Sequence, residues 1–167
     1  INRIKNALAV YDYVRIDHFR ALDRYYEIDQ GREDATVGEW IDVPSNELFN
    51  AIHSKVDKDR IIAEDLGFIT PDVRELLEFT GYPGMKILQF AFYDEDAEFL
   101  PRMYKTSNCV VYTGSHDADC TYTWIKNIEG DAKKRFKKEC LDKTTYKGVY
   151  AMIYLALSST ANLSIIP

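Results

Sequence analysis

The sequence predicts an α/β fold in which helices alternate with short parallel strands. Apolar runs of strand length recur along the chain with helix-like segments between them, and three of these runs end in acidic side chains. Such alternation implies right-handed crossovers and a parallel sheet covered on both faces. With 167 residues and 46% hydrophobic content, the chain is long enough for one domain with its own core and too short to expect two.

The first quarter of the chain is expected to form a helix, a strand and a loop. Residues 1–9 place apolar side chains at helical spacing and lead into the short run VRID at 14–17. The polar segment 23–43 is predicted to be an irregular loop, and loops of that length are usually functional.

A helix, a second strand and another helix are expected next. Residues 44–56 open with Pro and Ser and carry one apolar stripe at helical spacing. The run RIIAED at 60–65 is the second strand candidate. Thr70 and Pro71 are typical of an N-cap and the first position of a helix, which Gly81 is expected to end.

The second half of the chain continues the alternation. Strands are predicted at 85–92 and within 108–117, two helices between 131 and 158, and a fifth strand in the final segment 161–167. Five strands can belong to an open doubly wound sheet or to part of an eight-stranded barrel, and periodicity alone does not choose between them.

Composition excludes several classes of partner. A net charge of −6 and a pI near 5.1 argue against a nucleic-acid or anionic-membrane surface. The one basic run, at 133–139, is interpreted as the solvated face of a helix. Cys109, Cys120 and Cys140 lack the spacing of a zinc or redox site, which favours reduced thiols in a cytoplasm.

No run approaches the length of a membrane span, and nothing resembles a signal peptide. Ile1 is not a natural initiator, so we expect the native N-terminus to lie upstream of it.

Three acids follow strand candidates: Asp17 after VRI, Glu64 after IIA, and Asp117 after VVYTGSH. Active sites of parallel α/β folds lie at the carboxyl ends of the strands, where such acids converge. Converging carboxylates suit either a divalent metal or glycoside chemistry. A metal site would prefer more oxygen ligands and would gain nothing from Arg15. On a strand Arg15 faces the same side as Asp17 and would keep that carboxylate ionised as a nucleophile.

Glu64 is the better candidate for the general acid because apolar residues precede it, and apolar surroundings favour a protonated carboxyl. Asp65 faces the opposite side and is expected to anchor a loop. An Arg–Asp pair at a strand end is, taken alone, more often architectural than catalytic. His18 and His53 are assigned to structure or surface. The succession of three acidic strand ends is what favours a catalytic interpretation.

Four segments together closely resemble amylomaltases, the bacterial 4-α-glucanotransferases also called disproportionating enzymes. They are VRIDHFRALDRYYEI, RIIAEDLGFITPDVRELL, PGMKILQFAF and VVYTGSHDADCTYTW, and the resemblance runs from near Ile4 to Pro167. It implies a cytoplasmic (β/α)8 barrel enzyme, without metal or cofactor, that transfers α-1,4-glucan segments between malto-oligosaccharides with retention of anomeric configuration.

The resemblance also implies residue roles. Asp17 is expected to be the nucleophile, Glu64 the general acid/base and Asp117 the carboxylate that stabilises the transition state. Arg15 and His116 match sugar-contacting positions, and Phe90 matches an aromatic residue of the glucan groove, where apolar sugar faces stack on rings.

Three departures from the family pattern stand out. Ala118 occupies the place of the usual Asn after the His-Asp pair, which removes an amide near the site. Tyr26 stands where Trp is usual, and the segment 42–45 replaces a glycine-rich turn.

Length is the larger departure, because a barrel of this type needs roughly 250 residues. We expect residues 1–167 to be the C-terminal part of one catalytic barrel domain, from about strand four to strand eight. An incomplete barrel exposes strand edges, so we expect the isolated chain to be inactive or to need a complementary piece. Two alternatives remain: an α-glucan hydrolase on the same barrel, or an inactive truncated fragment that retains glucan binding.

Overall fold

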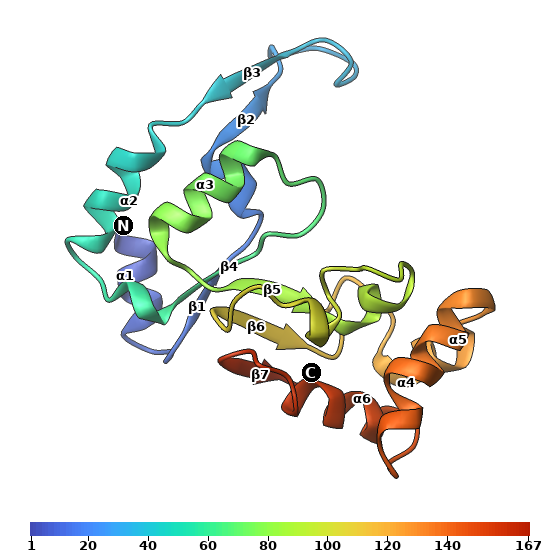
Figure 1. Cartoon of the computed structure of the whole chain (residues 1–167). Helices are drawn as coiled ribbons and strands as arrows, with labels where there is room; N and C mark the ends of the chain where they lie inside the picture. Colours follow the sequence, from blue (N-terminus) through green and yellow to red (C-terminus); the bar gives the residue numbers. More distant parts are fainter. The chain divides into compact units, whose positions relative to one another are not determined.

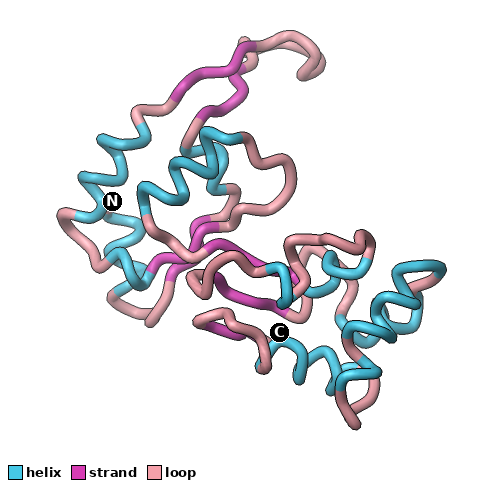
Figure 2. The backbone as a smooth tube through the Cα atoms, viewed as in Figure 1, coloured by secondary structure: helices cyan, strands magenta, loops and turns pink.

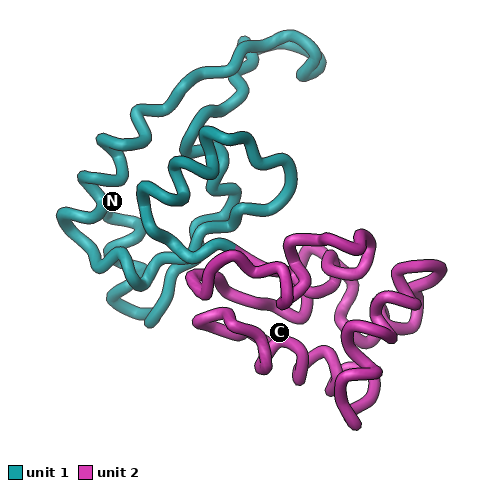
Figure 3. The backbone as a smooth tube through the Cα atoms, in the orientation of Figure 1, with its two compact units in different colours: residues 1–84 teal, residues 85–167 magenta.

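The computed structural model describes residues 1–167, which divide into two compact units, residues 1–84 and 85–167 (Figure 3). The elements are mixed α and β, in short pieces separated by long loops (Figure 2). The strands form three separate sheets, none of which closes into a barrel. The helices are all too short or too polar to cross a membrane.

The first unit contains three α-helices and four strands, with a fifth strand beginning at its last residue (Figure 1). In chain order these are α1 (Asn2–Leu8), β1 (Val14–Ile16), β2 (Arg24–Glu27), β3 (Glu39–Asp42), α2 (Ser45–His53), β4 (Ile61–Ala63) and α3 (Pro71–Thr80).

Strands β1 and β4 pair in parallel, with Ile16 opposite Ala63. One face of this pair belongs to a buried core that also contains residues of α1, α2 and α3. Val14, Ile16, Ile61 and Ala63 lie on that face. Because side chains alternate along a strand, Arg15 and Ile62 lie on the opposite face. The helices of this unit therefore cover one face of the strand pair, whereas the alternating pattern predicted a sheet covered on both faces.

Three aromatic rings fill the centre of this core. Phe19, Phe49 and Tyr82 are fully buried, with ring centroids between 5.6 and 6.3 Å apart. The Tyr82 hydroxyl is hydrogen-bonded at 2.8 Å to Nε2 of His53, the last residue of α2. His53 is thus structural, as expected from the sequence.

The segment 23–43 was expected to be irregular but contains an antiparallel hairpin. Strand β2 pairs with β3, with Tyr26 opposite Trp40, and the hairpin extends away from the helices (Figure 1). Its turn is long and polar, which obscured the alternation of the two short flanking strands. The hairpin base is tied to α3 by Arg24, whose Nη2 donates to Asp72 Oδ2 at 2.9 Å.

Helix α3 begins and ends where the sequence predicted. The Thr70 hydroxyl accepts a hydrogen bond from the Val73 N–H, and Pro71 occupies the first turn. Gly81 ends the helix in the left-handed conformation, with φ +71°.

The second unit contains three strands and three α-helices. In chain order these are β5 (Gly84–Ile87), β6 (Cys109–Tyr112), α4 (Thr121–Asn127), α5 (Gly130–Glu139), α6 (Val149–Leu157) and β7 (Leu163–Ile165). The sheet order is β5-β6-β7, with β6 and β7 parallel. The run predicted as a strand at 85–92 leaves β5 after Ile87 and continues as a 3-10 helix over Leu88–Phe92. Helix α4 was not predicted.

Aromatic rings also dominate the core of the second unit. Phe92, Trp124 and Phe136 pack with centroids between 5.2 and 5.7 Å apart. Beside them the nearly buried Glu139 pairs with Lys143 at 2.5 Å and with Arg102 at 3.4 Å. These cations hold the pKa of Glu139 below its usual value, chiefly through the Lys143 hydrogen bond.

Candidate functional site

Asp17 follows β1 directly and stands largely exposed at its carboxyl end. Nη2 of Arg15 lies 2.7 Å from Asp17 Oδ1, with the Asp17 side chain 74% exposed and Arg15 26% exposed. The two residues share one face of the strand, as their spacing predicted. A fixed guanidinium therefore lies against a carboxylate that solvent or substrate can reach.

Glu64 takes the next position in register on the neighbouring strand. The parallel ladder continues past the last paired residues, because the Glu64 N–H donates to Ile16 O at 2.9 Å. The Glu64 carbonyl accepts from the Phe19 N–H at 3.1 Å. Asp17 and Glu64 thus leave adjacent strands at the same level and on the same side, away from the helix-covered core.

Main-chain donors orient the Glu64 carboxylate. Oε2 accepts a hydrogen bond from the His18 N–H and Oε1 accepts one from the Leu66 N–H, both at 2.8 Å. The sequence pattern suggested apolar surroundings, yet both oxygens face N–H groups of the loops that follow β1 and β4. The carboxylate is thereby held toward the residues next to Asp17.

His18 has an unusual backbone, which no feature of the sequence reveals. It is the one non-glycine residue with positive φ, at φ 49° and ψ 53°. This left-handed conformation is uncommon for side chains with a Cβ, and such strained residues cluster at functional sites. At His18 it turns the chain after Asp17 so that the N–H reaches Glu64. His18 therefore serves the site through its main chain.

Asp65 lies against the backbone of Gly84, the first residue of β5. A Cβ at position 84 would fall on the Asp65 carboxylate, so any larger residue there would require Asp65 to move. This packing is consistent with the loop-anchoring use suggested by its alternation with Glu64.

Asp117 and His116 belong to the second unit, on the exposed loop that follows β6. His116 Nε2 lies 3.2 Å from Asp117 Oδ1, and the Asp117 N–H donates to Ser115 Oγ at 3.3 Å. Ala118, which follows, donates its N–H to the Ser115 carbonyl at 3.3 Å. The His-Asp pair thus rests on a tight turn started by Ser115.

Gln89 supports this loop from beneath and was missed by the sequence interpretation. It is 1% exposed, and its Nε2 donates to the Asp119 carbonyl at 2.8 Å, while Oε1 is buried without a partner. Gly114 lies so close that a Cβ there would meet Nε2 at 2.7 Å. A single amide within the apolar run ILQFAF was the available signal, because a buried amide must be satisfied.

Phe90 follows Gln89 on the 3-10 helix and is partly exposed. Its ring packs edge-on against Phe99 with centroids 5.6 Å apart. Within the first unit, the structure therefore brings together Arg15, Asp17 and Glu64. Within the second unit, it places Phe90 next to Gln89, the residue that supports the loop of His116 and Asp117.

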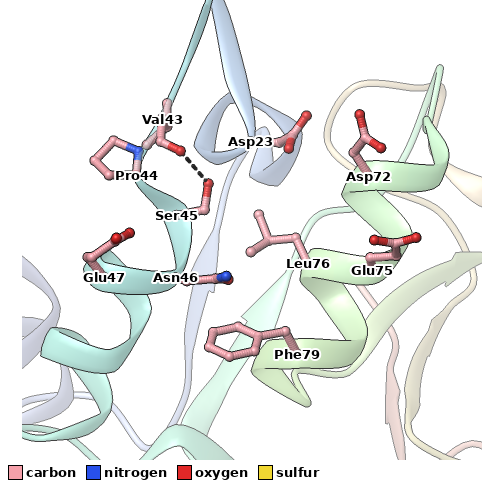
Figure 4. A pocket seen from close by; sticks show the side chains of 10 residues that line it. All are labelled: Asp23, Val43, Pro44, Ser45, Asn46, Glu47, Asp72, Glu75, Leu76 and Phe79. Carbon is pink, nitrogen blue, oxygen red and sulfur yellow. Dashed lines mark hydrogen bonds between the residues drawn. The ribbon is translucent and has the colours of Figure 1, made fainter.

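A pocket of about 510 Å³ lies elsewhere in the first unit, between the beginning of α2 and helix α3 (Figure 4). Its wall includes the carboxylates of Asp23, Glu47, Asp72 and Glu75, together with the ring of Phe79. None of the predicted site residues lines it. No group of three or more His, Cys, Asp or Glu side chains is arranged to hold a metal ion.

Comparison with known proteins gives one consistent result. The family model described as 4-alpha-glucanotransferase, glycoside hydrolase 77, matches residues 1–167. The chain is 41% identical over 166 residues to a 4-alpha-glucanotransferase of Streptococcus pneumoniae, covering 99% of this chain and 33% of that protein. It is 42% identical over 167 residues to the 4-alpha-glucanotransferase of Clostridium butyricum, covering 99% and 34%.

A solved structure agrees with these relatives. The amylomaltase from Streptococcus agalactiae in complex with acarbose superposes with a TM-score of 0.87 at 32% identity, covering 99% of this chain and 34% of that one. The chain thus spans about a third of the length of the relatives it matches. Over the whole of its length it belongs to the 4-alpha-glucanotransferase family, whose solved members include amylomaltases.

Proposed function

We propose that this chain carries the catalytic carboxylates of a 4-α-glucanotransferase that moves α-1,4-glucan segments between malto-oligosaccharides. The observation that carries the proposal is the register-matched pair Asp17 and Glu64 at the ends of adjacent parallel strands. Such strands lie ~4.8 Å apart, close to the carboxyl separation of about 5 Å in retaining glycoside enzymes. Family membership over all 167 residues supports the same chemistry.

In the first step Asp17 attacks the anomeric carbon of the donor glucan. The carbon–oxygen bond to the leaving chain breaks as Glu64 gives its proton to the glycosidic oxygen, and a covalent glucosyl ester forms on Asp17. Arg15 at 2.7 Å stabilises the Asp17 carboxylate before attack.

In the second step an acceptor sugar replaces the leaving chain. Its hydroxyl loses a proton to the Glu64 carboxylate and its oxygen attacks the same anomeric carbon, which breaks the ester to Asp17 and restores both carboxyl groups. Two inversions give net retention. Hydrolysis results when water takes the place of the acceptor, so transfer requires that the acceptor reach the ester first.

Asp117, His116 and Phe90 complete the proposal as substrate-binding groups. The exposed Asp117–His116 pair would hold sugar hydroxyls of the distorted ring, and Phe90 would receive an apolar sugar face. An amylomaltase of the family is described in complex with acarbose, which supports α-glucans as the ligand class.

The test is a maltotriose incubation of the protein purified from its source or expression host, with the intact mass measured alongside. From a protein whose mass is well above 19.3 kDa, a ladder of longer and shorter oligosaccharides is expected, and Asp17→Asn and Glu64→Gln should each lower the rate by a factor of about 10³ or more. Asp12→Asn, at an acid before β1, is the matched control and should leave the rate unchanged. Glucose and maltose alone would identify a hydrolase, and no products at a mass of 19.3 kDa would favour the inactive fragment.

A further inference from the structure

An exposed cluster of one cation and two aromatic rings lies beside the paired carboxylates. The Arg20 guanidinium carbon lies 5.4 Å from the centre of the Trp40 ring and 5.9 Å from the centre of the Phe68 ring. Arg20 Nη1 also donates to the Phe68 carbonyl at 3.0 Å. Both rings remain open to solvent, with Trp40 53% and Phe68 75% exposed. These three residues are called the Arg20 cluster below.

The position of the Arg20 cluster follows from the chain path. Arg20 comes three residues after Asp17, and Phe68 comes four residues after Glu64. Both segments leave the carboxyl ends of β1 and β4, which pair in parallel. The cluster therefore lies at the same end of the strand pair as the two carboxylates.

The surrounding structure holds the cluster in place. Trp40 packs against Tyr26 across the hairpin, with ring centroids 5.3 Å apart. The hairpin base is fixed by the Arg24–Asp72 pair at 2.9 Å and by Ser45, whose hydroxyl donates to the Leu22 carbonyl at 2.6 Å. A ligand that used these rings would not have to order them first.

The bonding of Arg20 favours a ligand over a purely structural role. Arg20 forms no ion pair and uses a single N–H in a hydrogen bond within the chain, although acidic residues flank Trp40 on the same hairpin. If another protein segment covered Arg20 without accepting hydrogen bonds from it, the remaining N–H donors would be buried without partners, which costs free energy. Flat exposed rings beside uncommitted donors match a sugar, which presents an apolar C–H face and a rim of hydroxyl groups.

We propose that Arg20, Trp40 and Phe68 form a subsite for a glucose unit of an α-1,4-glucan, next to the reacting bond. The sugar face stacks on Trp40 or Phe68, and the free N–H groups of Arg20 donate to its hydroxyls. This inference rests on the proposed function, since it assigns the subsite to the same glucan. The uncharged sugar also suits a chain of net charge −6 better than an anionic ligand does.

The test is a binding measurement on the 167-residue chain with maltoheptaose as the probe. The chain has two tryptophans, of which Trp124 is buried and Trp40 is exposed. Maltoheptaose is expected to protect the fluorescence of Trp40 from quenching by acrylamide. The protection should disappear in Trp40→Phe, which retains Trp124 and so supplies the baseline.

Affinity electrophoresis in gels containing soluble starch gives an independent readout. Trp40→Ala and Arg20→Met should each weaken retardation by about tenfold in dissociation constant, the equivalent of one stacked ring or one set of hydrogen bonds. Tyr11→Ala, which removes an exposed ring before the amino end of β1, is the matched control and should bind like the unmodified chain. Circular dichroism of every variant excludes loss of fold.

Two outcomes would overturn the subsite. One is starch binding that Trp40→Ala and Arg20→Met leave unchanged; the other is absence of any maltoheptaose protection at Trp40. Neither outcome bears on the proposed function, which is decided by the maltotriose ladder and its dependence on Asp17. Conversely, a confirmed subsite together with no ladder from a protein of mass well above 19.3 kDa would leave glucan binding established and transfer refuted.

Discussion

At the scale of single residues, the cysteines differ sharply in their surroundings. Cys120 is exposed before α4, and a hydrogen bond with the Thr123 hydroxyl at 3.3 Å holds the pKa of its thiol below the usual value. Burial raises the pKa of the Cys140 thiol to about 12, and Cys109 is also buried. The thiolate is the reactive form, so reactivity should concentrate at Cys120.

We therefore expect iodoacetamide at pH 7.5 to alkylate Cys120 at least ~10-fold faster than Cys109 or Cys140. Peptide mass spectrometry at successive times measures the three rates. Thr123→Val removes the hydroxyl while keeping the shape of the side chain and should slow alkylation of Cys120. Equal rates at the three cysteines would contradict this assignment.

His53 makes the stability of the first unit depend on pH. Burial, aided by the charge of Lys58, lowers the pKa of His53 below its usual 6.5. Below pH 6.5 the unfolded chain takes up a proton that the folded chain resists, so the free energy of unfolding falls as the pH drops through this range. Above pH 6.5 the imidazole is neutral in both states, and its full contribution is present.

Urea denaturation at pH 7.5 and 5.5 tests this dependence. His53→Gln can keep a hydrogen bond to Tyr82 but cannot titrate, so its midpoint should fall less between the two pH values than that of the unmodified chain. Acids such as Glu139 titrate in both proteins, so the difference between the two decreases in urea midpoint reports the contribution of His53 alone. Parallel falls in both proteins would show that His53 does not contribute.

The residues of the candidate site divide into those that the sequence could reveal and those that it could not. Asp17 and Glu64 were found because acids at strand ends follow a topological rule. The left-handed backbone of His18 and the approach of Arg20 to the rings of Trp40 and Phe68 depend on contacts between segments far apart in sequence. No local pattern carries such contacts, so sequence reasoning assigned His18 to structure or surface and made no assignment for Arg20.

At the scale of elements, helix α3 shows how local chemistry defines a boundary. The Thr70 hydroxyl accepts from the Val73 N–H, which would otherwise lack a partner in the first turn. We expect Thr70→Ala to cost about 1 kcal/mol in the free energy of unfolding, measured by urea denaturation. Thr70→Ser, which keeps the oxygen, should be nearly neutral. An equal loss of unfolding free energy in both variants would show that packing of the Thr70 methyl group, and not the cap, is responsible.

The loop after β6 depends on a close contact between Gly114 and Gln89. A Cβ at position 114 would meet Gln89 Nε2 at 2.7 Å and Cδ at 3.0 Å, and Gln89 is too deeply buried to move aside freely. Gly114→Ala should therefore destabilise the protein by about 1–3 kcal/mol, measured by urea denaturation, and displace the loop that carries Asp117.

A double-mutant cycle separates this contact from other effects of the added methyl group. Gln89→Ala removes the amide and its bond to Asp119, so Gly114→Ala should cost much less in that background. If the free energies lost in Gly114→Ala and Gln89→Ala add up to the loss in the double variant, the two positions do not interact. The loop would then depend on something other than Gln89.

The ends of helices were predicted better than the ends of strands, for a physical reason. Helix α3 carries its own cap, proline and terminal glycine, which define where it begins and ends. Strands β1, β4 and β7 were predicted as apolar runs, but three residues are too few for a period that would define their ends. The β2–β3 hairpin went unseen because its strands are mostly exposed, so their pattern is not apolar. The run from Leu88 to Phe92 is buried in a 3-10 helix and resembles a strand in composition alone.

At the scale of the whole molecule, the chain matches about a third of the solved amylomaltase. Its strands form sheets of two and three strands, whereas the amylomaltase that it matches is about three times longer. Large hydrophobic side chains such as Val10, Tyr150 and Leu157 are exposed on it. Exposed apolar groups and strand edges favour association with further polypeptide.

We expect the isolated 167-residue chain to show no disproportionation of maltotriose, because it spans about a third of the length of its relatives and its sheets do not close into a barrel. Chromatography after prolonged incubation measures this directly. In a second experiment the chain is co-expressed with the remaining two thirds of a family member. This pair should form a soluble complex that disproportionates maltotriose faster than the chain alone. An oligosaccharide ladder from the isolated chain would refute the expectation.

The continuation of the β1–β4 ladder past its last paired residues makes one amide a reporter of the whole carboxylate pair. The Glu64 N–H is bonded to Ile16, and the Glu64 carbonyl is bonded to the segment after Asp17. The amide proton of Glu64 can exchange with deuterium only when β1 and β4 separate, and the same motion would separate the two carboxylates. The exchange rate at this single position therefore measures how often the site comes apart, without substrate and without turnover.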